Sequence, residues 1–143
     1  MSTDCIFCKI INKTLEAAFL YEDDDIIAFM DILPINKGHT LIIPKIHVDR
    51  IEDLSEKIYL KIHSVGLDIL KKIKINIPET TAFNVFIANG ADAGQDVFHS
   101  HLHIIPRRPN DGLIIKYEFG DPISIEERQQ VANQILEKNL RES

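Results

Sequence analysis

His99-Ser-His-Leu-His-Ile-Ile105 is the stretch of sequence that decides most about this chain. In a β-strand, successive side chains point to opposite faces of the sheet, so His99, His101 and His103 are predicted to share one face. Neighbouring histidines would then be about 6.6–6.8 Å apart along the backbone. The apolar residues between and after them would point to the other face and pack in the core. Three imidazoles in register on one strand predict a functional site rather than simple packing.

Two kinds of chemistry suit such a row of histidines. Imidazole is a common metal ligand, and two histidines at positions i and i+2 of a strand can hold one ion. A neutral imidazole is also a nucleophile, and a protonated neighbour can stabilise negative charge. Two close imidazoles resist being protonated together, so the members of the row can divide these roles. The spacing of the strand alone leaves both chemistries open.

The loop directly before this strand, residues 89–95, is rich in small residues. It consists of Asn-Gly-Ala-Asp-Ala-Gly-Gln. Glycine and alanine let a ligand approach the backbone closely, where N–H groups can point at phosphate oxygens. The Gln95 side-chain amide can donate to the same oxygens. Because the histidine row follows at once, the loop predicts a phosphate-binding segment.

The rest of the chain predicts further strands and two helices. Short apolar runs between turn residues predict strands at residues 17–22, 25–31, 39–44, 81–88 and 99–105. A capping-box spacing at residues 53–56, followed by apolar residues at intervals of three and four, predicts a helix to about Ile75. A second capping box at residues 124–127 predicts a helix to about Leu140, after an irregular segment at residues 106–122. This order favours an α+β fold with an antiparallel sheet.

Composition and charge are those of one small globular domain. The 143 residues are 45% hydrophobic and 27% charged, with a net charge of −6, which gives no sign of a nucleic-acid or anionic-membrane surface. The apolar runs are far shorter than the roughly 20 residues of a membrane span. The N-terminus lacks the basic and apolar regions of a signal peptide. We therefore expect a single cytoplasmic domain over residues 1–143, with neither nucleic acid nor a membrane as a partner.

The two cysteines, Cys5 and Cys8, lie three residues apart at the start of the chain. None is left to link distant parts of the fold, which agrees with a reducing compartment. A Cys-x-x-Cys pair is typical of either redox chemistry or metal binding. A thioredoxin-like βαβ pattern does not surround this pair, so metal binding is favoured.

Taken together, these segments resemble the histidine triad (HIT) family, whose signature is His-φ-His-φ-His-φ-φ with φ apolar. The similarity covers most of the chain and is carried by residues 5–10, 30–32, 38–47, 89–90, 93–95 and 99–107. It implies a HIT-like fold: a five-stranded antiparallel sheet with a long central helix and a C-terminal helix, usually paired as a homodimer.

The resemblance also implies a nucleotide hydrolase or nucleotidyl transferase, acting on a purine nucleotide of the AMP type. His101 would attack the α-phosphorus of an ester, anhydride or phosphoramidate and form a nucleotidyl-histidine, which water resolves. His103 would bind the phosphate, a role that favours its protonated ring. His39 would be a hydrogen-bonding partner of these two. The segment 106–143 would line the side of the leaving group.

Two segments would supply the nucleotide contacts that the resemblance implies. Asp31 would accept hydrogen bonds from the ribose hydroxyls, and Ile32 would wall the base or ribose. The phosphate would face the following residues: Asn89, Gly94, Gln95, Asp96, His101 and His103.

The sequence departs from the family pattern at three positions. Ser100 stands where an apolar residue is usual, and Ala88 replaces an asparagine often found ahead of the loop. Asp96 stands where serine or threonine is common. A carboxylate repels a phosphate charge by about 1 kcal/mol at 4 Å in water-like surroundings. We therefore expect Asp96 either to turn outward or to weaken nucleotide binding.

Some relatives that carry the Cys-x-x-Cys pair bind zinc, and the resemblance implies a structural zinc here as well. Its ligands would be Cys5, Cys8, His47 and His99, a complete tetrahedral set. This arrangement assigns His99 to structure and leaves His101 and His103 for chemistry.

Two other functions remain open at this point. In a zinc-activated phosphohydrolase, an ion on the histidine row would generate hydroxide, and chelation would abolish turnover. In a non-catalytic nucleotide sensor or scaffold, the same pocket would bind a nucleotide without releasing product.

Overall fold

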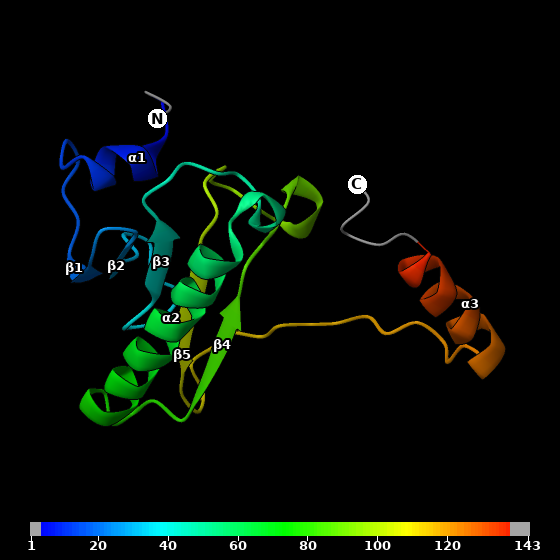
Figure 1. Cartoon of the computed structure of the whole chain (residues 1–143). Coiled ribbons are helices and arrows are strands. Elements are labelled where there is room, and N and C mark those ends of the chain that lie inside the picture. The colour runs from blue at the N-terminus through cyan, green and yellow to red at the C-terminus, as the bar shows by residue number, and fades with distance from the viewer. Residues whose placement is uncertain (1–3, 138–143) are drawn as a thin grey trace. The chain divides into compact units, whose positions relative to one another are not determined.

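The computed structural model describes residues 4–137 of the chain. The chain divides into two units, Met1–Asp111 and Gly112–Ser143. The first unit holds the sheet and all of the histidines and cysteines, and the second holds one helix (Figure 1). Among the described residues, no helix has both the length and the apolarity needed to cross a bilayer. A single domain over residues 1–143 stays a prediction.

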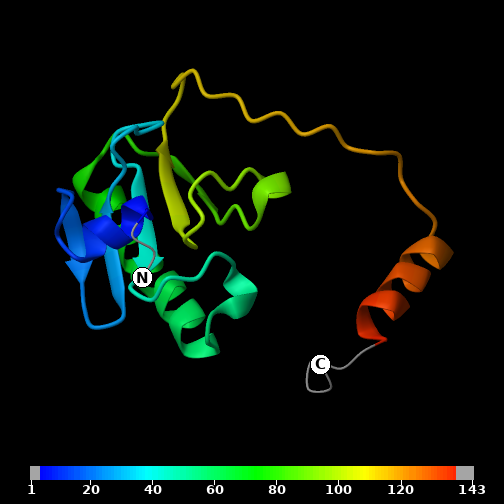
Figure 2. The ribbon, with the colours of Figure 1, turned by 90° about the horizontal axis from the view of Figure 1, so that it is seen from above.

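A five-stranded antiparallel sheet forms the centre of the first unit (Figure 1). Its strands are β1 (Phe19–Glu22), β2 (Ile26–Met30), β3 (Thr40–Pro44), β4 (Ala82–Phe86) and β5 (Leu102–Arg107). Their order in the sheet is β1-β2-β3-β5-β4, and every neighbouring pair is antiparallel. Figure 2 shows β5, in yellow, running between β3 and β4. The predicted α+β class and the five-stranded antiparallel sheet are confirmed.

Residues 4–137 form three α-helices: α1 (Ile6–Ile11), α2 (Glu56–Asn76) and α3 (Ile125–Leu136). The last two are the predicted central and C-terminal helices. No sequence pattern predicted α1, because six residues are too few to show helical periodicity. The expected end of the last helix near Leu140 lies outside the described residues.

The N-terminal ends of α2 and α3 show whether the two predicted capping boxes are present. For α3 the box is confirmed: the Ser124 side chain accepts from the Glu127 N–H, and the Glu127 side chain accepts in return from the Ser124 backbone. For α2 the predicted box at residues 53–56 is wrong. The N-cap is Ser55, because residues 51–53 close a 3₁₀ turn and Leu54 packs against the core before the helix begins.

One face of the sheet is covered by α2. The helix buries a stripe of apolar side chains spaced three and four residues apart: Ile62, Val65, Ile69 and Ile73. Leu102 and Ile104 of β5 point into the same core, as predicted. The helix lies close to the sheet at Gly66, where an added Cβ would be 2.8 Å from a Leu102 methyl group. A side chain at that position would push the helix away.

The other face of the sheet carries the second core, which includes α1. Its buried residues are Phe7, Ile10, Ile27, Phe29, Leu41 and Ile43. Because side chains alternate along each strand, His103, which pairs with Leu41, lies on this face and not on the α2 face. The histidine site is therefore built between β5 and the short N-terminal helix.

Candidate functional site

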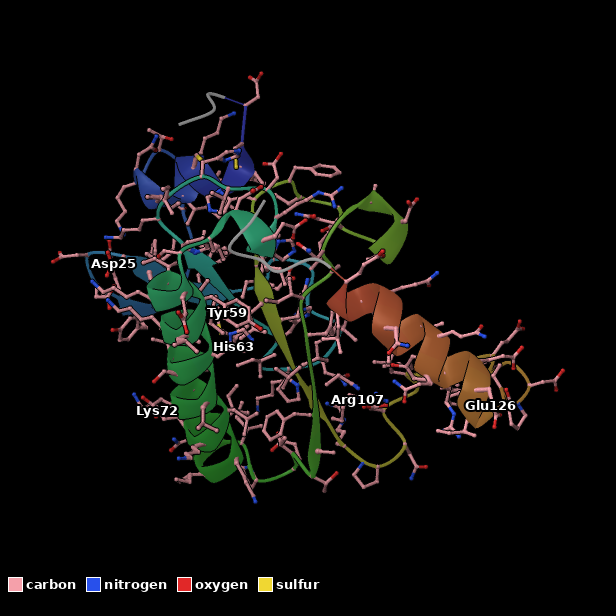
Figure 3. All side chains as sticks on the ribbon, turned by 45° about the vertical axis from the view of Figure 1, so that its right-hand side comes forward. Asp25, Tyr59, His63, Lys72, Arg107 and Glu126 are labelled. Atoms are coloured by element: carbon pink, nitrogen blue, oxygen red, sulfur yellow. The ribbon has the colours of Figure 1, made fainter. Side chains whose placement is uncertain are left out.

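Five of the six histidines gather on the α1 face of the sheet, in two neighbouring groups. His101 lies between His103 and the Phe7 ring, with ring centroids 4.7 Å and 5.1 Å away. His39 lies 5.3 Å from His103, and His47 lies 5.0 Å from His99. The sixth, His63, lies apart on α2 beside Tyr59 (Figure 3).

The predicted strand 99–105 begins later than expected. The last residue pair between β3 and β5 joins Ile42 to Leu102, and the N–H of Ser100 donates to the Val48 carbonyl instead of to β3. Of the three histidines only His103 therefore lies within a strand. The shared face is kept, because Phe7 contacts both His99 and His101. Because His99 and His101 lie outside the strand, their backbone groups can form hydrogen bonds to histidine rings.

His101 is oriented by one such backbone contact. Its Nδ1 lies 2.8 Å from the His99 carbonyl oxygen, and the ring is 2% exposed. A carbonyl oxygen only accepts, so Nδ1 of His101 carries a proton. In the neutral ring the other nitrogen, Nε2, then holds a lone pair. This is the form in which imidazole acts as a nucleophile.

A chain of two hydrogen bonds gives His103 the opposite tautomer to His101. The backbone N–H of Ile35 donates to Nδ1 of His39 over 3.1 Å. A neutral His39 therefore carries its proton on Nε2, which lies 3.0 Å from Nδ1 of His103. Nδ1 of His103 accepts this hydrogen bond, and the neutral His103 ring carries its own proton on Nε2. The pair thus offers a lone pair on His101 and an N–H donor on His103.

The burial of these rings decides their charge. Burial lowers the pKa of His103 from its ordinary value of 6.5 to about 4, and the neighbouring rings of His101 and His39 act in the same direction. Burial also lowers the pKa of His39. Both rings are therefore neutral at neutral pH. This opposes the expectation of a protonated His103, whose contribution becomes a hydrogen bond from a neutral ring.

A turn held by a polar network presents the Ile35 N–H. The Asn36 side chain donates to the Pro106 carbonyl over 3.0 Å and to the Asp111 carboxylate over 2.9 Å. Arg107 binds the same carboxylate through two nitrogens, at 2.7 Å and 3.1 Å. Arg107, at the end of β5, is labelled in Figure 3. The network fixes the turn that begins the chain of hydrogen bonds to His103.

Two aromatic side chains contact the histidines without having been predicted as site residues. Phe86 stacks on His103 with ring centroids 4.6 Å apart and an angle of 16°. It comes from β4, whose register places it directly opposite His103. Phe7 packs edge-on to His101. The order of the strands in the sheet, which brings β4 beside β5, could not be derived from the sequence pattern.

A cavity of about 750 Å³ lies on the α1 face of the sheet, and two of its lining residues contact histidines: Phe7 contacts His101, and Asp31 contacts His39. Asp31 and Ile32 line it, and Asp31 Oδ2 lies 3.5 Å from Nε2 of His39. The rest of its lining is mainly apolar: Ile6, Phe7, Ile10, Leu15, Phe19, Phe29 and Leu41. The charged side chains in the lining are Lys13, Glu16 and Asp31. A mainly apolar lining with a few polar groups suits a flat base joined to a sugar. Asp31 and Ile32 were predicted from the sequence, whereas the rest of the apolar wall was not.

The predicted phosphate loop is held in place by its own amide side chains. Asn89 accepts from the Ile51 N–H at 2.9 Å and donates to Glu52 at 2.7 Å. The Gln95 amide donates to the Asp49 and Val97 carbonyls, at 2.7 Å and 3.1 Å, and accepts from the Gly90 N–H at 2.7 Å. These side chains are thus bonded within the scaffold. Contact with a phosphate would come from the loop backbone, where Gly94, at φ 85°, leaves open space.

Asp96 does not turn away from the histidines. Its side chain is 79% exposed, yet Oδ1 lies 3.6 Å from Nε2 of His101. The same oxygen accepts from the Val97 N–H at 2.9 Å. The carboxylate therefore faces the nitrogen that holds the lone pair.

The four predicted metal ligands come together beside this site. One ligand atom from each of Cys5, Cys8, His47 and His99 lies within 4.8 Å of the others. Three Sγ-to-Nδ1 distances are 3.3, 3.5 and 3.7 Å. Sulfur and nitrogen ligands of one tetrahedral zinc are roughly 3.5 Å apart. The spacing fits a zinc ion with all four positions filled.

The surroundings also prepare these histidines to bind a metal. Nε2 of His99 lies 2.8 Å from the Pro44 carbonyl, and Nε2 of His47 lies 3.1 Å from the Asp49 carboxylate. Each ring thus carries its proton on Nε2 and turns the Nδ1 lone pair toward the cysteines. Cys5 caps α1 and accepts from the Cys8 N–H, so the first helical turn brings the two sulfurs together.

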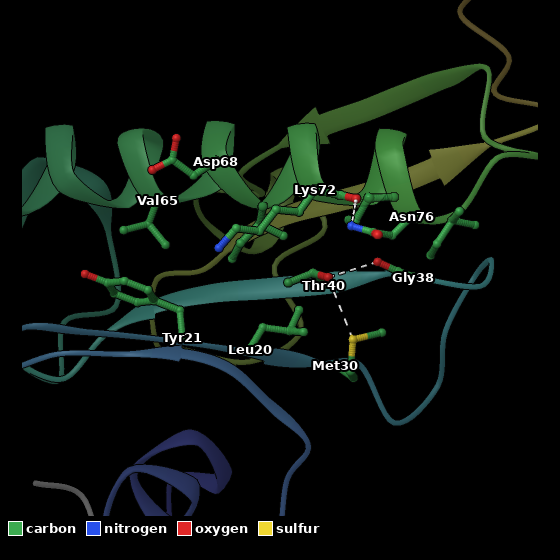
Figure 4. Close-up of a pocket in the computed structure, with 12 residues that line it drawn as sticks. Leu20, Tyr21, Met30, Gly38, Thr40, Val65, Asp68, Lys72 and Asn76 are labelled. Carbon is green, nitrogen blue, oxygen red and sulfur yellow. Dashed lines mark hydrogen bonds between the residues drawn. The ribbon is translucent and has the colours of Figure 1, made fainter.

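A second hollow, of about 380 Å³, lies on the α2 side of the sheet (Figure 4). The described residues that line it include neither histidine nor cysteine. Its Thr40 hydroxyl donates to the Gly38 carbonyl at 2.9 Å, and the Asn76 amide donates to the Lys72 carbonyl at 2.9 Å. Because these polar groups serve the fold, the histidine cluster is the candidate site.

Comparison with known proteins identifies relatives of this chain. The HIT domain model matches residues 12–110. The chain is 42% identical over 133 residues to an uncharacterized HIT-like protein of Borreliella burgdorferi, covering 92% of this chain and 96% of that protein. It is 39% identical over 137 residues to an adenosine 5′-monophosphoramidase of Schizosaccharomyces pombe, covering 94% and 97%.

Solved structures show the same fold. A crystal structure of a HIT family protein from Bacillus anthracis superposes with a TM-score of 0.88 at 40% identity, covering 96% of this chain and 98% of that one. A zinc-bound histidine triad family protein from Mycobacterium smegmatis gives a TM-score of 0.75 at 32% identity, covering 96% of this chain and all of the other.

Proposed function

Because this chain belongs to the HIT domain family of nucleotide hydrolases, we propose that it cleaves nucleotides through a covalent nucleotidyl-histidine on His101. The observation that carries the proposal is that two adjacent imidazole rings are opposite tautomers. His101 directs a lone pair, and His103 an N–H, toward the same side of the sheet. A nucleophile and a hydrogen-bond donor for a phosphate oxygen are thereby supplied together.

The reaction has two displacements at the α-phosphorus. In the first, the lone pair on Nε2 of His101 forms a bond to phosphorus, and the bond to the leaving group breaks. The leaving atom keeps the electron pair and takes a proton from solvent. In the second, water attacks phosphorus, the P–N bond returns its pair to Nε2, and the proton of the water is lost to solvent. His103 Nε2–H donates to the phosphate oxygen throughout.

The nucleotide would lie in the cavity beside the histidines. Asp31 would accept from the ribose hydroxyls, and Ile32 with the apolar wall would contact a purine base. The loop backbone around Gly94 would face the phosphate, whereas Asn89 and Gln95 would support that loop. An AMP derivative is the substrate class that these features and the similarity to a monophosphoramidase support. The role of residues 106–143 on the side of the leaving group stays a prediction from the sequence.

A structural zinc belongs to the same proposal. Cys5, Cys8, His47 and His99 would hold it, and the ion would supply a cross-link between α1 and the sheet. With four protein ligands the ion would have no open position for water. This supports histidine chemistry over a zinc-activated phosphohydrolase. We propose a homodimer and a cytoplasmic location as well, on the resemblance to the family.

The test is to incubate the protein with adenosine 5′-phosphoramidate and to measure released AMP. We expect His101→Asn to lose activity by a factor of about a thousand or more. His63→Asn, a matched histidine on α2, should retain it. Rapid acid quenching should trap a nucleotide on the wild-type chain only at His101. Undiminished release by His101→Asn would refute the proposal.

A non-catalytic nucleotide-binding protein is the second candidate. The carboxylate of Asp96, 3.6 Å from the attacking nitrogen, is the observation that favours it. Binding of AMP by calorimetry, with no release from the phosphoramidate, would support this alternative.

A further inference from the structure

The proposed reaction makes no use of the Asp96 carboxylate. Its Oδ1 lies 3.6 Å from Nε2 of His101, the atom that would attack phosphorus. A phosphate oxygen of a bound nucleotide must approach this same nitrogen. The carboxylate therefore stands beside the place that an anionic group of the substrate has to enter.

A second carboxylate lies on the other side of the histidine pair. Asp31 lies 3.5 Å from His39, and the charges of Asp96 and Asp31 both act on His103. Within residues 4–137, neither carboxylate forms an ion pair with a lysine or an arginine. Sites for polyphosphates commonly depend on such cations. A highly charged nucleotide would meet these two carboxylates, and Lys13, which lines the same cavity as Asp31, is itself paired with Glu22.

We propose that Asp96 is a specificity-determining residue that selects nucleotides by their negative charge. The site favours a nucleotide whose charge is confined to the α-phosphate and whose leaving group is neutral or cationic. It disfavours nucleotides with further phosphates. The inference rests on the proposed function, because it assumes that the α-phosphate binds at His101.

The size of the effect follows from Coulomb repulsion near a water-exposed surface. At about 4 Å in water-like surroundings one pair of like charges changes binding roughly fivefold. A further phosphate lies farther from Asp96, so each added charge contributes less. Salt screens the repulsion, because the Debye length is about 10 Å at 0.1 M ionic strength.

The experiment measures binding of adenosine, AMP, ADP and ATP by calorimetry, in magnesium-free buffer of low ionic strength. It compares the wild type with Asp96→Asn and with Asp68→Asn. Asparagine at position 96 keeps an oxygen for the Val97 N–H. Asp68 is an exposed carboxylate on α2, across the sheet from the histidines, so its variant has the same net charge. It controls for a general change in charge.

We expect adenosine to bind all three proteins equally. Asp96→Asn should bind AMP about fivefold more tightly than the wild type does, and ADP and ATP by a larger factor. Asp68→Asn should match the wild type. Unchanged affinities for AMP, ADP and ATP in Asp96→Asn, or an equal change in Asp68→Asn, would overturn the inference. If no nucleotide binds to any of the three proteins, the proposed function itself fails.

Discussion

Two groups of histidines lie side by side on one face of the sheet, and they differ in which ring nitrogen the backbone holds. In His99 the Nε2–H donates to the Pro44 carbonyl, so Nδ1 faces the cysteines. In His101, two residues later, the Nδ1–H donates to the His99 carbonyl, so Nε2 faces outward. One carbonyl contact therefore separates the proposed metal ligand His99 from the proposed nucleophile His101.

The two groups also differ in what they hold together. The cysteine–histidine group joins α1 to the end of β3 and to the segment before β5. The pair of His101 and His103 is joined instead to the turn before β3, through His39 and the Ile35 N–H. Changes in the first group should therefore act on stability, and changes in the second group on the reaction. The predictions below test this separation.

Among the changes that test this separation, the largest effect is expected from His103→Ala. It removes the imidazole N–H that would donate to the phosphate, and loss of a comparable donor lowers kcat by about 10²–10³-fold. The melting temperature should change little, because the ring is partly exposed. Steady-state release of AMP and calorimetric melting measure the two. A drop of kcat below tenfold would show that His103 has no part in charge stabilisation.

Cys8→Ser should give the converse result. Removing one sulfur weakens zinc binding, and a ligand present at 100 times its Kd stabilises the folded state by about 2.7 kcal/mol. We expect a loss of roughly that size in the free energy of unfolding, with kcat/KM preserved at temperatures where the variant is folded. A chelator should lower the melting temperature of the wild type and leave that of Cys8→Ser unchanged. Equal sensitivity of both proteins to the chelator would contradict a zinc at this cluster.

The sequence allowed both groups of residues to be identified but not the orientation of their rings. Alternation along a strand predicts that His101 and His103 share a face, and three-residue spacing predicts that Cys5 and Cys8 come together. Two of the partners that set the tautomers lie far away in the chain: the Pro44 carbonyl holds His99, and His39, which the Ile35 N–H orients, holds His103. A backbone amide has no residue-specific signal, so no sequence pattern could assign those contacts.

The same limit explains the errors at particular residues. Asp-x-x-Glu at 53–56 has the spacing of a capping box, yet the packing of Leu54 moves the helix start to Ser55. The Gln95 amide can donate to phosphate, but in the structure it donates to the Asp49 and Val97 carbonyls instead. Local chemistry predicts what a side chain can do. Tertiary packing decides which of its possible partners it meets.

A smaller change should sharpen the metal side of the comparison. Asp49→Ala removes the carboxylate that orients His47, at 3.1 Å from its Nε2. Such outer partners of a metal ligand are worth about 10–100-fold in affinity, and the exposed Asp49 carboxylate places the expected loss at the lower end of that range. Competition with a zinc-sensitive dye measures the affinity. Asp92→Ala is the matched control, and equal zinc affinity in both variants would exclude an orienting role for Asp49.

The smallest expected effect is the dependence of stability on pH that arises from His103. Its pKa is lowered by burial from 6.5 to about 4 in the folded chain. Below pH 6.5 the unfolded chain takes up a proton that the folded chain does not, so the free energy of unfolding falls between pH 6.5 and 4. Because the ring is partly exposed, we expect about 1 kcal/mol by pH 5. Urea titrations of the wild type and His103→Ala at pH 7 and pH 5, both with chelator, isolate this share. Identical losses in the two proteins would mean that His103 is not held as a neutral ring. His103 would then act on the phosphate as a protonated ligand and not as a neutral hydrogen-bond donor.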